Sequence, residues 1–326
     1  MSGPWYLGID GGQTRTRAVV ADATGQVVGR GVGGPSNHVE APGGRDRLRA
    51  GVSDSVAAAL QQAGLPVLAE IAFASVYCGM TGEADYKHEV IAPLLRTSAL
   101  LVEHDAPAAL AGATVGEAGI IAIAGTGSVV YGETSSGERA RTGGWGYLFG
   151  DEGSGFGLAR DAVRAALDAL DDVGPETALV AALSARFATP DLRELPMAMY
   201  NGHVSRDALA AAARDVLTVW LDGDHVADRV VHEGLDALAR RVDAVARRLG
   251  MTDPLVCLSG GVFTSMPYAD AFAIHVRHHL PEARVAPAQL SAAAGAVLLA
   301  YRAVGVPITE TLKAQLAGSA READDT

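Results

Sequence analysis

The chain has 326 residues, 49% of them hydrophobic, and a formal net charge of −12. This length allows two domains of ordinary size, each with its own core. The acidic balance argues against a protein that binds nucleic acid or anionic membranes, because both are recognised through concentrated Lys and Arg.

The two cysteines, Cys78 and Cys257, lie far apart in the sequence. They exclude a disulfide framework and any zinc or iron–sulfur site built from four cysteines of one chain, and we expect two buried thiols. The N-terminus has no basic segment followed by an apolar one, and no apolar run approaches the ~18 residues of a membrane span. We therefore expect a cytoplasmic protein with neither membrane nor nucleic-acid partners.

The first third of the chain alternates short apolar stretches with Gly-rich and Asp-rich breaks. Strands are predicted at residues 5–9, 17–22, 26–33, 71–77 and 100–104. Helical patterns occupy residues 45–63 and 89–95. The first three strands follow each other closely, so we expect them to pair antiparallel.

The same order of elements starts again after residue 116. Strands are predicted at residues 119–124, 128–133, 139–143 and 255–259, and helices at residues 161–170, 206–220, 230–249 and 291–304. The pattern indicates an α/β fold that uses a βββαβα unit twice. We place the domains at residues 1–116 and 117–326, with the last helix able to pack across the boundary. We expect the domains to meet directly and to form a cleft.

A glycine turn with an acid follows the first predicted strand, in the segment Leu-Gly-Ile-Asp-Gly-Gly-Gln-Thr of residues 7–14. Gly11 and Gly12 would let backbone N–H groups approach a phosphate, the Thr14 hydroxyl can donate to it, and Asp10 can hold a Mg²⁺ ion. Taken alone, the pattern is equally typical of a hairpin turn.

A second turn of this kind begins the second half, in the segment Ala-Gly-Thr-Gly-Ser of residues 124–128. Its candidate phosphate ligands are Gly125, Thr126, Gly127 and Ser128. Two such hairpins at equivalent places of a duplicated fold can hold a polyphosphate from both sides. Neither turn leads into a helix, which excludes a Rossmann dinucleotide site, and the chain has no P-loop motif.

Asp105 directly follows the last predicted strand of the first half and begins a predicted helix. One interpretation is a helix N-cap, for which Asp is a favoured residue. The other is a general base that accepts the proton of an alcohol. The sequence around Asp105 leaves both open.

Two further glycine-rich segments carry chemistry. Residues 142–157 combine many glycines with Trp145, aromatic residues and Asp151, a mixture that suits recognition of sugar hydroxyls. Residues 258–263 end a strand in Gly260 and Gly261, where the backbone can approach a nucleotide. By contrast, His275, His278 and His279 lie in a polar, helix-like stretch without a supporting carboxylate pattern, and we assign them a structural role.

These five segments, in this order, resemble the actin, hexokinase and heat-shock-protein ATPase superfamily, and within it the N-acetylglucosamine kinase and BadF/BadG/BcrA/BcrD-type ATPase family. The resemblance runs from Tyr6 to about Ala300. It implies two actin-like, ribonuclease H-like domains with ATP in the cleft between them. The positions that match the family's nucleotide-binding residues are Gly11, Gly12, Thr14, Gly125, Thr126, Gly127, Ser128, Gly260 and Gly261. The positions that match its sugar-binding residues are Asn37, Gly144, Trp145 and Asp151.

The resemblance also implies a mechanism, with Asp10 beside the metal and Asp105 as the catalytic base. It implies an ATP- and Mg²⁺-dependent kinase that phosphorylates the 6-hydroxyl of N-acetylglucosamine, and it leaves a homodimer open. The alternatives are a glucosamine or other hexose kinase, an energy-coupling ATPase, and a non-catalytic sugar sensor. The chain departs from the family at Gln13, where a glycine is common, so a positive φ there would strain the turn.

Overall fold

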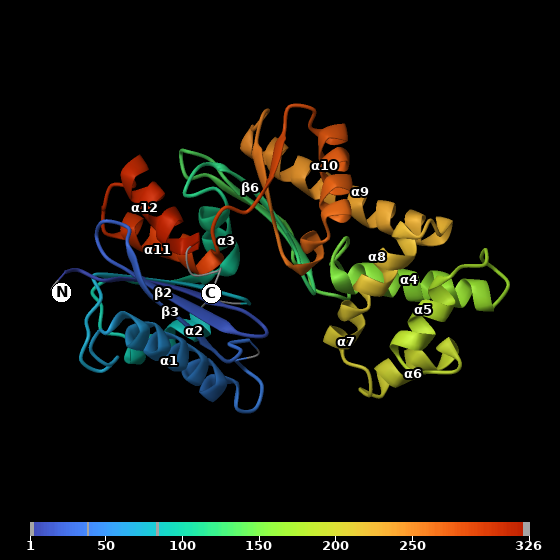
Figure 1. Ribbon diagram of the computed structural model, residues 1–326, viewed down its shortest axis with the longest axis horizontal. Helices are drawn as coiled ribbons and strands as arrows, with labels where there is room; N and C mark the ends of the chain where they lie inside the picture. Colours follow the sequence, from blue (N-terminus) through green and yellow to red (C-terminus); the bar gives the residue numbers. More distant parts are fainter. Residues whose placement is uncertain (1–2, 38, 83–84, 322–326) are drawn as a thin grey trace. The chain divides into compact units, whose positions relative to one another are not determined.

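The computed structural model describes residues 3–37, 39–82 and 85–321, and these form two compact units. The first unit takes its residues from Met1–Gly119 and Pro287–Thr326, drawn in blue, cyan and red in Figure 1. The second unit is Ile120–Ala286, drawn in green to orange. Each unit contains one five-stranded sheet. This duplication confirms the predicted α/β fold class.

The first unit holds strands and helices from both ends of the chain. Its strands are β1 (Tyr6–Gly11), β2 (Thr16–Ala21), β3 (Val27–Gly33), β4 (Ser75–Met80) and β5 (Leu100–His104). Its helices are α1 (Gly44–Ala63), α2 (Asp85–Ile91), α3 (Asp105–Ala113), α11 (Ala292–Ala303) and α12 (Glu310–Arg321). The sheet order is β3-β2-β1-β4-β5. As predicted, β1, β2 and β3 pair antiparallel, while β4 and β5 run parallel to β1.

Helices α1 and α11 cover opposite faces of this sheet (Figure 1). Glycines on the strands allow the helices to approach closely. A Cβ at Gly31 would lie 1.9 Å from the Ser55 carbonyl oxygen on α1, and a Cβ at Gly8 would lie 2.3 Å from the Ala293 carbonyl oxygen on α11. The sheet is therefore buried on both sides, which holds the ends of its strands in fixed positions.

The second unit repeats the sheet with longer helical insertions. Its strands are β6 (Gly119–Ala124), β7 (Ser128–Glu133), β8 (Arg139–Gly143), β9 (Leu255–Ser259) and β10 (Arg284–Pro287), in the order β10-β9-β6-β7-β8. Its helices are α4 (Gly155–Leu170), α5 (Leu179–Arg186), α6 (Leu195–Tyr200), α7 (Arg206–Ala211), α8 (Ala213–Leu221), α9 (His225–Leu249) and α10 (Met266–His279).

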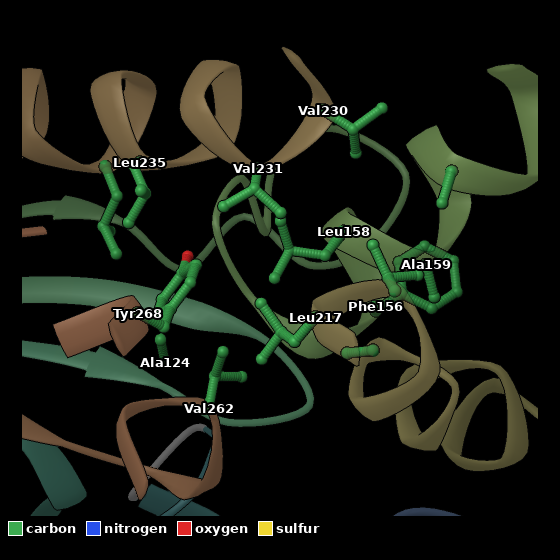
Figure 2. Close-up of a cluster of buried hydrophobic side chains, with 14 of the residues drawn as sticks. Ala124, Phe156, Leu158, Ala159, Leu217, Val230, Val231, Leu235, Val262 and Tyr268 are labelled. Carbon is green, nitrogen blue, oxygen red and sulfur yellow. The ribbon is translucent and has the colours of Figure 1, made fainter. Parts of the chain in front are cut away.

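The core of the second unit lies where the sheet meets α4, α8 and α9 (Figure 2). Leu158 of α4, Leu217 of α8 and Leu235 of α9 are among its buried side chains. The Tyr268 hydroxyl of α10 is also buried, and it donates to the Gly153 carbonyl at 2.7 Å. This bond fixes the loop before α4, in which several candidate site residues lie.

Some elements differ from the sequence-based expectations for physical reasons. Strand β4 begins at Ser75 rather than at residue 71, because the buried Phe73 makes only an isolated bridge to Thr97. The helix expected at 89–95 begins at Asp85 and changes to a 3₁₀ turn at Ala92–Leu94, where Pro93 removes a backbone donor. Strand β10 and helix α12 were not predicted.

The compact units differ from the predicted domain ranges at the C-terminal end. Residues from Pro287 onward belong to the first unit, because α11 packs on α3 and β1 rather than on the second sheet. Both cysteines are free and buried, as expected. In the part of the chain that the structure describes, no helix has the length and apolar character required to cross a membrane.

Candidate active site

Three polar side chains lie at the carboxyl ends of the parallel strands in the first unit. Asp10 is near the end of β1, Thr81 follows β4, and Asp105 follows β5. The Thr81 N–H donates to the Gly11 carbonyl at 2.9 Å, which joins the first two strand ends. Ligands of open α/β sheets bind at this edge. The structure therefore brings the predicted metal residue and the predicted base to one place.

Asp105 is held by two short contacts, one to each carboxylate oxygen. The Thr81 hydroxyl donates to Oδ2 at 2.7 Å, and His104 Nδ1 lies 2.7 Å from Oδ1. Burial alone would raise the pKa of Asp105, but the hydrogen bonds from His104 and Thr81 and the charges of His104 and Lys87 outweigh it, so the pKa lies below its ordinary value. Asp105 is thus ionised at neutral pH.

The N-cap interpretation of Asp105 is wrong. His104 is the N-cap of α3, and Asp105 is the first residue of the helix itself. His104 Nδ1 also lies 3.2 Å from the Ala106 N–H, but one ring nitrogen cannot accept that bond while donating to Asp105. We assign the proton to Nδ1 because the 2.7 Å contact to the carboxylate is the shorter and the charge-assisted one.

Lys87 is a residue of this site that the sequence motifs did not indicate. Its side chain is buried, its ammonium donates to the Thr81 carbonyl, and its charge acts on Asp105. Burial lowers the pKa of Lys87, while Asp105 opposes this shift. The available signal was compositional, because Lys87 and Lys313 are the only lysines in a chain that otherwise uses arginine.

Asp10 lies in an electrostatically unfavourable position. Burial raises the pKa of Asp10 to about 6, the negative charge of Asp105 adds to the rise, and Arg17 opposes it. The Arg17 guanidinium is 3.9 Å from the carboxylate and does not fully compensate it. A carboxylate with so little compensation is suited to bind a cation.

Gly11, next to Asp10, has little room for a side chain. A Cβ at Gly11 would lie 2.6 Å from both Met80 Sδ and Ser36 Oγ. The Gly12 N–H donates to the Arg15 carbonyl at 3.0 Å, which closes the turn. The phosphate contact predicted for the Gly12 N–H would therefore compete with a bond inside the turn.

Gln13 and Thr14 lie within this turn, between Gly12 and Arg15, and Asn37 lies beside it. The Thr14 side chain is exposed, and the Ser36 N–H donates to the Gly12 carbonyl at 3.2 Å, which places the half-buried Asn37 next to the turn. Gln13 is not among the non-glycine residues with positive φ. The strain considered for Gln13 is therefore absent.

In the second unit, residues 125–128 form the turn between β6 and β7. The Gly125 N–H donates to the Gly127 carbonyl at 2.9 Å, and the Ser128 N–H donates to Asp151 Oδ1 at 3.0 Å. Among the described residues, the N–H groups of Thr126 and Gly127 have no acceptor. Two adjacent free N–H groups in a tight turn can bind an anion.

Gly260 brings a second glycine motif against this turn. Its φ is 106°, and a Cβ there would lie 2.3 Å from the Ala124 carbonyl oxygen. Gly261 has open space around its Cα. Strands β6 and β9 are parallel neighbours, so the two predicted nucleotide motifs lie side by side at their carboxyl ends.

Asp151 stabilises the same turn through its carboxylate. It is buried and adopts φ 65°, a conformation that a non-glycine residue rarely takes. While Oδ1 accepts from Ser128, Oδ2 accepts from Arg206 at 2.9 Å. A Cβ at Gly127 would lie 2.6 Å from Asp151 Oδ1, so glycine is needed there too. Arg206 is a second residue that the motifs did not indicate.

Gly144 and Trp145 lie in the loop between β8 and α4. The Gly144 N–H donates to the Ser128 carbonyl at 3.0 Å, so this loop is joined to the turn at residues 125–128. The Trp145 side chain is 71% exposed. Within the second unit, the structure therefore groups the predicted residues closely and leaves one large aromatic side chain in solvent, able to contact a ligand.

Comparison with known proteins assigns the chain to a family. The model of the BadF/BadG/BcrA/BcrD ATPase family matches residues 7–300. This chain belongs to the BadF/BadG/BcrA/BcrD ATPase family. The match confirms the resemblance seen in the motifs, and it spans both units of the structure.

Several members and structural relatives of this family are similar over nearly their whole length. The N-acetylmuramic acid/N-acetylglucosamine kinase of Clostridium acetobutylicum is 29% identical, over 91% of this chain and 98% of its own. The N-acetyl-D-glucosamine kinase of Dictyostelium discoideum is 27% identical, over 92% and 98%. A crystal structure of a Chromobacterium violaceum protein has 28% identity and a TM-score of 0.74, over 92% of this chain and 99% of that chain.

Proposed function

We propose that this protein is an ATP-dependent kinase that transfers the γ-phosphoryl group to the 6-hydroxyl of an amino sugar, with N-acetylglucosamine as the preferred acceptor. The observation that carries the proposal is Asp105, an ionised carboxylate fixed at a strand end by Thr81 and His104. The family and the two kinase relatives support the same reaction.

Asp105 would orient the acceptor hydroxyl and receive its proton. Each carboxylate oxygen has about two lone pairs, and each has one partner here, so acceptor capacity remains on both. A lowered pKa makes Asp105 a weak base in the ground state. That is sufficient for phosphoryl transfer, where positioning dominates and the hydroxyl becomes acidic as the transition state develops.

The oxygen donors of the first unit fit Mg²⁺. Asp10 offers a carboxylate oxygen, the type of ligand that Mg²⁺ prefers. Burial disfavours the negative charge of this carboxylate, and a nearby cation would compensate that charge. Among the described residues, no three His, Cys, Asp or Glu side chains form a site for a metal ion. Asp10 would therefore share the ion with nucleotide oxygens and water. When bound, Mg²⁺ neutralises phosphate charge.

The second unit would supply the nucleotide and sugar contacts. The free N–H groups of Thr126 and Gly127 suit phosphate oxygens, and the open space at Gly261 suits close approach of a ribose or base. We assign Gly144 and Trp145 to the sugar. The role of Asn37 in sugar binding stays a prediction from the family resemblance. Asp151 retains one lone pair on each oxygen for a sugar hydroxyl.

The preference for an acetamido sugar follows from the pairing of the nearby acids. Asp151 is ion-paired with Arg206 at 2.9 Å, and Glu152 with Arg241 at 2.6 Å. The negative charge of each acid is already compensated by an arginine, so neither acid can compensate an ammonium group, and burying an uncompensated ammonium is strongly unfavourable. Glucosamine should therefore bind less well than N-acetylglucosamine. The two kinases described above, which match this chain over nearly their whole length, are both named for N-acetylglucosamine.

The deciding experiment compares kcat/KM for N-acetylglucosamine, glucosamine, glucose and N-acetylmuramic acid at pH 7. We expect N-acetylglucosamine to exceed glucosamine. A tenfold or greater advantage for glucosamine would overturn the sugar assignment and leave the kinase reaction intact. Turnover of ATP that no sugar stimulates would overturn the kinase reaction and favour an energy-coupling ATPase. The burial of Cys78 and Cys257 argues against an ATPase whose cysteines hold an iron–sulfur cluster between two subunits. A cytoplasmic location and a homodimer stay predictions.

A further inference from the structure

A cavity of about 680 Å³ opens on the helical part of the second unit, between α4, α6, α7 and the loop before α4. Its floor is apolar and includes Phe156, Leu195 and Leu209, all of them buried. Leu148 and Tyr200 also line it and are largely exposed. Small-molecule sites in proteins have this size and this apolar character.

Three arginines give this cavity a positive charge in a chain whose net charge is −12. Arg160, Arg164 and Arg206 line it, and none of the described lining residues is acidic. Asp161 neutralises part of this charge, because it pairs with Arg160 at 2.8 Å and lies 4.0 Å from Arg164. The guanidiniums outnumber the acids that pair with them locally.

Arg164 and Arg206 have donors to spare. Arg164 is 77% exposed, and among the described residues its one ion pair is the long contact to Asp161. Arg206 uses one terminal nitrogen on Asp151, and its buried Nε has no acceptor among the described residues. The Arg206 guanidinium also lies over the Tyr147 ring, with 5.2 Å to the centroid. A carboxylate could accept from such unsatisfied donors.

We propose that this cavity binds a small ligand with an apolar body and a carboxylate, such as a medium-chain fatty acid. The apolar floor would take the body, and the arginines would take the charge. A sugar does not fit this description, because its hydroxyls would face Phe156, Leu195 and Leu209 without partners. Through Arg206, the ion-pair partner of Asp151, the cavity adjoins the proposed sugar contacts. The inference itself does not depend on the kinase reaction.

The test is calorimetric titration of the full-length protein with octanoate, compared with octanamide. We expect saturable binding of one octanoate per chain and at least about tenfold weaker binding of octanamide, which keeps the apolar body and loses the charge. Equal binding of the two would overturn the role of the arginines. The absence of saturable octanoate binding would overturn the site itself.

The variant Arg164→Gln tests whether octanoate binds in this cavity. This exposed side chain can change without disturbing the core, and we expect octanoate affinity to fall about three- to tenfold. Arg247→Gln is the matched control, because Arg247 is similarly exposed at 71% and pairs with Asp243 one helical turn away. An equal loss in both variants would show that octanoate responds to net charge alone. If Tyr200→Glu abolished a dimer seen in sedimentation, a second copy would be the occupant and the proposal would fail.

Discussion

Asp10→Asn should stabilise the protein at alkaline pH while weakening its activity. The pKa of Asp10 is raised from 3.8 to about 6 in the folded chain, so folding disfavours the ionised carboxylate. A shift of about two units at ~1.4 kcal/mol each sets an upper limit of about 3 kcal/mol. The gain should be smaller than this limit, because one-fifth of the Asp10 side chain is exposed and because Arg17 loses its partner in the variant. We expect the free energy of unfolding at alkaline pH to rise by about 1–3 kcal/mol and Tm to rise by several degrees.

The pH dependence of this gain tests its cause. Below pH 3.8, Asp10 is protonated in both the folded and the unfolded chain, and it costs the wild type no stability. The wild type loses stability as pH rises through about 6, because the folded chain then has to hold an ionised Asp10. Calorimetry in EDTA should therefore show the variant more stable at pH 8 and equal to wild type near pH 4. Asp46→Asn, on the exposed start of α1, should change neither value. A variant that is less stable at pH 8, or equally stabilised at both pH values, would show that the raised pKa of Asp10 does not cause the effect.

Four further substitutions test other parts of the site. Asp105→Asn should lower kcat by roughly 10²–10⁴ with little change in ATP binding, and near-normal turnover would remove the base from the mechanism. Lys87→Met removes a charge that lowers the pKa of Asp105, so the acid limb of the kcat/KM profile should move to higher pH; an unchanged profile would contradict the coupling. Gly260→Ala should destabilise the protein by about 2–5 kcal/mol in thermal unfolding, whereas Gly261→Ala, which meets no neighbour, should be tolerated.

The sequence predicted those features that depend on local residue order. The end of β1 at Asp10 and the turn at residues 125–128 were recognisable because an apolar stretch, an acid or hydroxyl, and glycines stand next to each other in the chain. The duplicated strand order followed from the same local signals. Gly260 was found as part of a motif, but its reason, close contact with the Ala124 carbonyl, required the parallel pairing of β6 and β9.

The residues that the sequence missed act through contacts between distant segments. Arg206 reaches Asp151 across 55 positions, and nothing around Arg206 indicates this partner. The carboxylate next to His275 and His279 was missed for the same reason. Asp236 of α9 lies 2.9 Å from His279 Nε2, although it is 43 residues away. Such pairs depend on how helices pack, which local periodicity does not specify.

The most direct test of the proposed kinase reaction follows the phosphoryl group itself. The protein is incubated with ATP, Mg²⁺ and N-acetylglucosamine, and the sugar product is identified by ³¹P NMR and mass spectrometry, with 6-deoxy-N-acetylglucosamine as the matched acceptor. We expect a sugar 6-phosphate formed in equal amount to ADP, and no phosphorylated product from the 6-deoxy sugar. ADP release at the same rate with and without N-acetylglucosamine, and no sugar phosphate, would contradict the proposed kinase reaction.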